Sequence, residues 1–190
     1  MKKATIIAAL LISSAATTFA QTWSVDKAHS RIGFNFTHLQ VAELGGTFNS
    51  IDGKITSAKP DFSDGAVEFS ADINSINTDN EQRDKHLQTA DFFDAEKFPK
   101  LTFKSTSWKK VADKKYKVTG DLTLHGVTKP VVLDVVLGGT GVHPQTKKPI
   151  AGFKITGTIK RTDFGIAPAL PSVMVSDNVN LSANAEFAQD

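Results

Sequence analysis

The chain has 190 residues, with 22 lysines and arginines against 20 aspartates and glutamates, 40% hydrophobic residues and no cysteine. This length is typical of one domain, and the lack of cysteine excludes disulfides, a thiolate nucleophile and any zinc or iron site held by cysteine. The formal charge of +2 would suit an anionic partner, but it depends on two lysines at the N-terminus.

Residues 1–20 have the pattern of a secretory signal peptide. Lys2 and Lys3 form a positive start, an apolar stretch covers residues 6–12, and Ala20 is a small residue suited to cleavage. The stretch is shorter than the roughly 20 apolar residues that cross a bilayer. We therefore expect a periplasmic mature chain, residues 21–190. Without Lys2 and Lys3 its basic residues number 20, equal to the 20 acidic ones, and no nucleic-acid partner is expected.

Most of the mature chain alternates between apolar and polar residues, the period of a β-strand with one buried face. Turn signals such as Asp52-Gly53, Asp64-Gly65 and His125-Gly126 separate the runs. The pattern predicts an all-β fold, a single antiparallel barrel or sandwich of about eight strands. The apolar positions of the runs include Ile32, Phe34, Phe36; Val67, Phe69, Ala71, Ile73; Leu101, Phe103; Tyr116, Val118, Leu122, Leu124; Val131, Leu133, Val135, Leu137; Phe153, Ile155, Ile159; and Leu181, Ala183, Ala185, Phe187.

One segment interrupts this alternation. Residues 78–95 begin with two possible N-caps, Thr78 and Asn80, and carry acidic residues in what would be the first turn. Pro99 follows shortly after the segment. This composition predicts a short helix, or two helical turns, near residues 79–94.

Phenylalanine is frequent, with 13 in the chain, of which only Phe19 precedes the mature part. Its side chain has no polar group, so a Phe-rich inner face builds an apolar interior. An eight-stranded barrel can be filled by its own side chains or can enclose one small ligand, and alternation does not decide between these. The inward side chains, our candidate ligand-binding residues, are by parity Phe34, Phe36, Phe48, Phe69, Ile73, Phe103, Leu122, Leu124, Leu133, Val135, Phe153, Ile155, Ile159 and Leu181.

Arg161 is a further candidate because it shares parity with Ile155 and Ile159. It would point into the apolar interior, where an unpaired charge is costly. Two interpretations remain open: a polar anchor for the headgroup of a ligand, or a structural ion pair with Asp163 or Asp177.

The five histidines do not form a recognisable catalytic or metal-binding pattern. His29 and His38 are nine residues apart, which places them on opposite faces of a regular strand. The sequence contains no HExxH, no histidine pair at i and i+4, and no G-x-S-x-G nucleophile elbow. We expect neither a metal site, nor a cofactor, nor catalytic residues.

Charge is unevenly distributed along the chain. Residues 72–96 hold seven acidic residues against Arg83 and Lys85, and residues 97–117 hold eight lysines against Asp113. The lysine-rich segment, Lys97 to Lys117, could approach anionic membrane headgroups or could be a solvated hairpin whose lysines protect strand edges. The sequence leaves both open.

Several segments together resemble one known family. The landmarks are DKAHS at residues 26–30, followed by Phe34, Phe36 and His38; GTF at 46–48, followed by Gly53; TDNEQRDKHLQTADFFDAEKFPKLTF at 78–103; TGDLTLHGVTKPV at 119–131; and RTDFGI at 161–166. Their order and spacing resemble those of the YceI-like family of bacterial polyisoprenoid-binding, lipocalin-like proteins.

This resemblance implies a soluble periplasmic barrel whose apolar bore holds one amphiphilic chain, typically a polyisoprenoid such as a quinone tail, for transport or storage. Two alternatives remain: a stress-response or adhesion protein with a filled barrel, and a small outer-membrane barrel. The second is disfavoured because the chain has only two tryptophans and one tyrosine for two aromatic girdles. A monomer and a homodimer are both compatible with the sequence.

Overall fold

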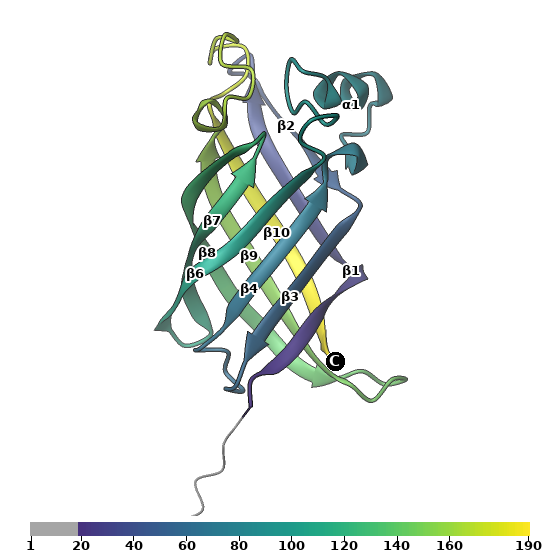
Figure 1. Ribbon diagram of the computed structural model, residues 1–190, viewed down its shortest axis with the longest axis vertical. Helices are drawn as coiled ribbons and strands as arrows, with labels where there is room; N and C mark the ends of the chain where they lie inside the picture. The colour runs from purple at the N-terminus through teal and green to yellow at the C-terminus, as the bar shows by residue number, and fades with distance from the viewer. Residues whose placement is uncertain (1–18) are drawn as a thin grey trace, which may run out of the picture.

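The structure is a computed structural model that describes residues 19–190. The expected signal peptide, apart from Phe19 and Ala20, lies outside the described residues. Eight strands form a closed antiparallel barrel, with one short helix near one end (Figure 1), which confirms the predicted fold class. No helix among residues 19–190 is both long and apolar enough to cross a membrane.

The closed ring has the strand order β1-β3-β4-β6-β7-β8-β9-β10, and β10 pairs with β1 to complete it. Strands β2 and β5 extend the wall at one end, where β2 pairs with the second half of β1 and β5 pairs with β2. The strands are β1 (Gln21–His38), β2 (Ala42–Phe48), β3 (Ile51–Ser57), β4 (Ala66–Asp72), β5 (Ile76–Asn77), β6 (Lys100–Ala112), β7 (Lys115–Leu124), β8 (Val127–Val142), β9 (Pro149–Lys160) and β10 (Asn178–Gln189); the helices are α1 (Glu81–Gln88) and the short 3₁₀ turns η1 (Ile73–Ser75) and η2 (Arg161–Phe164).

The two ends of the barrel differ. The end that we call the mouth carries the tip of the β1–β2 hairpin, α1 and the loop of residues 161–177, the mouth loop (Figure 1). The opposite end, the base, carries the β3–β4, β6–β7 and β8–β9 connections and the C-terminus. Because neighbouring strands run in opposite directions, residues that are distant in the sequence meet at the same end of the barrel.

A bulge in β1 changes which side chains face inward. Between the pairs Asp26–Glu186 and Arg31–Asn184, β1 advances five residues while β10 advances two. The three extra residues reverse the parity of β1, because side chains alternate between faces. Val25 faces inward before the bulge, and even-numbered residues such as Phe34 face inward after it.

Helix α1 (Glu81–Gln88) confirms the short helix of about two turns that the sequence predicted near residues 79–94. Asn80 is the N-cap, since its side chain accepts a hydrogen bond from the Arg83 N–H at 2.9 Å. Thr78, the other candidate, instead donates its backbone N–H and its hydroxyl to the Asp84 carboxylate. The chain leaves the helix at Thr89 and continues in turns towards β6.

Aromatic side chains fill the base of the barrel. Phe62, in the loop between β3 and β4, inserts between the rings of Trp23 and Phe153, with centroid distances of 5.1 Å to each. Tyr116 fixes this loop by donating its hydroxyl proton to the Asp61 carbonyl oxygen. The base is therefore a packed aromatic core; we call it the aromatic plug, and its members are Trp23, Phe62, Trp108, Tyr116, Phe153 and Phe187.

Candidate functional site

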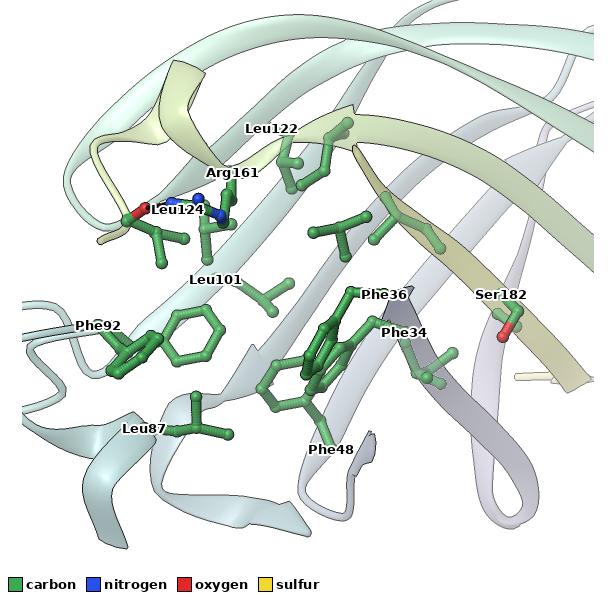
Figure 2. Close-up of a pocket in the computed structure, with 18 of the residues that line it drawn as sticks. Phe34, Phe36, Phe48, Leu87, Phe92, Leu101, Leu122, Leu124, Arg161 and Ser182 are labelled. Carbon is green, nitrogen blue, oxygen red and sulfur yellow. Dashed lines mark hydrogen bonds between the residues drawn. The ribbon is translucent and has the colours of Figure 1, made fainter. Parts of the chain in front are cut away.

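An apolar cavity of about 430 Å³ occupies the part of the barrel nearer the mouth. Its walls are the inner faces of the strands, and α1 and the mouth loop contribute further side chains. Figure 2 shows the rings of Phe34, Phe36 and Phe48 on one side of the cavity and Leu122 and Leu124 on the other. Both the volume and the apolar lining are typical of pockets for small molecules.

All but three of the side chains expected to face the interior line this cavity. Phe34 lies at the centre of a ring cluster, with centroid distances of 6.5 Å to Phe36 and 5.7 Å to Phe48. Their contact with a ligand stays a prediction. The expected residues that line the cavity are Phe34, Phe36, Phe48, Phe69, Phe103, Leu122, Leu124, Leu133, Ile155, Ile159, Leu181 and Arg161.

The structure places the other three, Ile73, Val135 and Phe153, in the packed core. Strand β4 ends at Asp72 and the chain turns into η1, so the alternation that suggested an inward Ile73 stops one residue earlier. Val135 pairs with Tyr116 nearer the base, and Phe153 belongs to the aromatic plug. Parity identified the inner face but did not show where along the barrel the open space ends.

Side chains outside the strands complete the cavity and were not expected. Leu87 of α1, with Phe92 and Phe93 of the following turns, closes the side near the helix, and the Phe93 ring lies 6.4 Å from that of Phe48. The mouth loop adds Ile166 and Val175. The apolar pair Phe92-Phe93, in an otherwise polar segment, was the available signal for a buried cover.

Arg161 lies at the mouth of the cavity and is 4% exposed. Its guanidinium donates to the carbonyl oxygens of Ile166 at 3.0 Å and Leu170 at 2.6 Å, and also to those of Ala167 and Val175. Four carbonyl groups of the mouth loop thus surround the charge. Within the described part of the chain, its Nε has no hydrogen-bond partner.

Of the two interpretations of Arg161, the ion pair with Asp163 or Asp177 is not formed, because these carbonyl contacts take its place. Asp177 instead accepts hydrogen bonds from Thr162, at 3.1 Å from the backbone N–H and 2.7 Å from the hydroxyl. These bonds, assisted by the nearby Arg161 charge, lower the pKa of the Asp177 carboxyl. Sequence parity placed Arg161 correctly but could not show that a loop would supply its partners.

The other ionisable side chains of the lining are Arg83, His86 and His38. Arg83 donates to the hydroxyl of Thr78 at 2.8 Å and to its carbonyl at 2.6 Å, which ties α1 to the chain before it. His86 lies 3.4 Å from the Asp91 carboxylate. With His38 and Arg161, these are the ionisable side chains that line the cavity among residues 19–190, and no carboxylate is among them.

The β1 bulge gathers Asp26, His29 and Glu186 on the outer wall, with ligand atoms within 4.8 Å of one another. Asp26 already accepts hydrogen bonds from the backbone N–H groups of Ala28 and His29 and pairs with the His29 ring at 2.9 Å. That pairing lowers the pKa of Asp26 and raises the pKa of His29. These contacts explain the cluster as a support for the bulge, and the expected absence of a metal site stays a prediction.

The lysine-rich segment runs along the wall from the mouth to the base. Its lysines meet acidic side chains of neighbouring strands, with Nζ–O distances of 2.7 Å for Lys104–Glu68 and 2.6 Å for Lys117–Asp134. The tip of this hairpin, at residues 113–114, lies at the base, away from the cavity. Its contact with a membrane stays a prediction.

A closed barrel with an apolar cavity and hydrogen-bond donors at the mouth has the architecture of a barrel-type binding protein. The profile of the YceI-like domain matches residues 23–187, so the chain belongs to the YceI-like family. The protein YceI of Escherichia coli is 39% identical over 183 residues, which cover 95% of this chain and 94% of that protein.

Solved structures share the fold. The YceI protein of Campylobacter jejuni is 35% identical, with a TM-score of 0.71, over 87% of this chain and 96% of that one. A polyisoprenoid-binding domain of Saccharophagus degradans, at 17% identity, has a TM-score of 0.62 over 90% of this chain and 99% of that one. This second likeness concerns the fold alone.

Proposed function

We propose that this chain binds a long-chain amphiphile, of which a polyisoprenoid with a quinone-type headgroup is the leading candidate, and carries or stores it in the periplasm. The observation that carries the proposal is the apolar cavity at the mouth of the barrel. A domain of the same fold from Saccharophagus degradans is described as polyisoprenoid-binding, and we propose the same ligand class for this chain.

The hydrophobic effect provides the driving force. Each buried methylene contributes roughly 0.8 kcal/mol, so a prenyl chain gains ample free energy to offset the cost of ordering it. Such a lining selects for girth and length and little for chemistry. The polar headgroup then lies at the mouth, where Arg83 and the Nε–H of Arg161 provide donors for a carbonyl or phosphate oxygen.

The aromatic plug limits how deep the tail can reach. Phe103 and Leu133 line the cavity, whereas Phe153 lies in the packed base. We propose that the tail enters through the mouth and ends above the plug, so that a longer chain bends or leaves part of its length outside.

Two features argue against the two alternatives, the membrane-spanning barrel and the filled scaffold. A membrane-spanning barrel presents an apolar band to lipid, whereas this outer wall carries charged pairs such as Glu68–Lys104 and Lys117–Asp134. A filled scaffold has no room for a ligand, whereas this barrel contains a cavity of about 430 Å³. Export rests on the signal-peptide pattern of residues 1–20.

Native mass spectrometry of the protein purified from its own host tests the proposal. We expect a co-purifying prenyl or acyl species that organic extraction removes. Ile155→Asp should abolish most of its occupancy because it places a carboxylate in the cavity, while Thr156→Asp, on the exposed face of the same strand, should not. Ligand-free protein in every preparation, or equal occupancy in both variants, would contradict lipid carriage.

A further inference from the structure

Four large apolar side chains are exposed together at the mouth. Leu39 and Val41, at the tip of the β1–β2 hairpin, are 51% and 88% exposed, and Val173 and Met174, in the mouth loop, are 54% and 45% exposed. We call these four residues the apolar rim. Both segments protrude from the same end of the barrel (Figure 1).

Hydrogen bonds join the two halves of the rim. The Leu39 N–H donates to the Met174 carbonyl at 2.9 Å, and the Ser176 N–H donates to the Thr37 carbonyl at 2.9 Å. His38 and Val175 form a β-bridge between these contacts. The rim is therefore one connected surface rather than two independent loops.

The hairpin tip holds Leu39 outward in an unfavourable conformation. Leu39 and Gln40 both have positive φ values, 52° and 58°, and the Val41 N–H donates to the His38 carbonyl at 3.0 Å. Two consecutive positive φ values are typical of a type I′ turn, which favours asparagine and glycine. Leucine prefers a negative φ and a buried side chain, and Leu39 has neither. Such departures from the usual sequence preferences are expected at functional sites.

The rim is continuous with the cavity and lacks charge. His38 and Val175, which bridge the two halves, also line the cavity. Residues 37–42 and 164–176 contain no lysine, arginine, aspartate or glutamate. Protruding apolar segments without charges can enter the boundary between headgroups and acyl chains with no charge to desolvate.

We propose that the apolar rim inserts into the surface of a lipid bilayer and so places the mouth of the cavity against the membrane. The use of this membrane contact for loading and releasing a ligand rests on the proposed function. The insertion itself rests on three features of the rim: its exposed apolar side chains, the hydrogen bonds that join its two segments, and its lack of charged residues. The base, with the tip of the lysine-rich hairpin, then faces water.

Flotation with vesicles of phosphatidylethanolamine and phosphatidylglycerol tests this proposal on the mature protein. The rim variant combines Leu39→Ser, Val41→Ser, Val173→Ser and Met174→Ser. The matched control changes four exposed valines outside the rim, with Val111→Ser, Val132→Ser, Val136→Ser and Val142→Ser. Native mass spectrometry of each variant reports lipid occupancy, and sedimentation velocity reports its oligomeric state.

We expect the wild-type protein and the control to float, and the rim variant to lose vesicle binding by about tenfold or more. Binding that high salt abolishes and the rim variant retains would assign the membrane contact to the lysines and overturn the proposal. A wild-type protein that does not float would also overturn the proposal. If that wild-type protein is a dimer and the rim variant is a monomer, the rim binds a second copy of the chain instead of a membrane. Rim-dependent flotation without any bound lipid would leave the insertion supported and contradict the proposed lipid carriage instead.

Discussion

At the mouth, Arg161 makes contacts that a side chain of the same charge could not reproduce. Arg161 makes bonds to four carbonyl oxygens that come from four positions of one loop. A planar guanidinium distributes its N–H donors over such a set, whereas the ammonium of lysine is a compact point with three donors. The arginine therefore holds the mouth loop in the position that shapes the cavity.

We expect Arg161→Lys to lower the free energy of unfolding by about 1–3 kcal/mol, because several buried carbonyl groups lose their donors. Urea denaturation followed by circular dichroism measures this change. Arg31→Lys, on the exposed outer wall, is the matched control. Equal stability of the two variants would show that the carbonyl contacts of Arg161 contribute little.

The pair Asp26–His29 makes a pH-dependent contribution to the β1 bulge. Its hydrogen bond lowers the pKa of Asp26 from 3.8 and raises the pKa of His29 from 6.5. The Asp26 contribution is present above its unfolded value and is lost as the pH falls through its folded value. The His29 contribution is present below 6.5 and is lost as the pH rises through its folded value.

NMR titration of the His29 ring protons should therefore give a pKa above 6.5 in the wild-type protein. Asp26→Asn removes the negative partner and should return the His29 pKa towards its ordinary value. An unchanged His29 titration in Asp26→Asn would show that the pair is not formed in solution.

At the scale of the elements, the alternation of apolar and polar residues was enough to predict the strands, an antiparallel barrel or sandwich and most of the inner face, and the family resemblance then indicated the barrel. It could not predict the aromatic plug, because Phe62 enters the base from a loop with a positive φ of 54°, where no periodic pattern exists. The cover formed by Leu87 and Phe92 was missed for a related reason. Its residues follow helical and turn geometry, and only the tertiary arrangement brings them over the cavity.

The aromatic plug can be tested as the lower limit of the cavity. Phe62→Ala removes a fully buried ring and should lower the free energy of unfolding by about 3–5 kcal/mol. It should also extend the cavity towards Trp23 and Phe153, so that the bound lipid becomes longer. Phe62→Leu keeps most of the volume and should leave the chain length unchanged.

Urea denaturation and mass spectrometry of the extracted lipid measure the two effects separately. A destabilised Phe62→Ala variant with unchanged lipid length would contradict the role of the plug as a stop, while leaving its structural role intact.

The whole molecule is polarised along its long axis. The mouth combines the cavity, the basic side chains of its lining and the apolar rim, and the base combines the aromatic plug with the tip of the lysine-rich hairpin. Packing at the base stabilises the barrel independently of the contents of the cavity. The carrier role proposed above requires such an arrangement, because a ligand would have to leave the mouth without unfolding the wall.

This division predicts how the stability of the whole barrel depends on its ligand. A ligand at 100 times its dissociation constant stabilises the folded state by about 2.7 kcal/mol, and a domain of this size gains roughly 2–4 °C in Tm per kcal/mol. Protein stripped by organic extraction should therefore refold with a Tm lower by about 5–11 °C. Adding back the extracted lipid should restore the Tm in the wild-type protein and in Thr156→Asp, but not in Ile155→Asp. Calorimetry measures these shifts, and a Tm that is equal with and without bound lipid would show that the lipid does not occupy a site formed by folding.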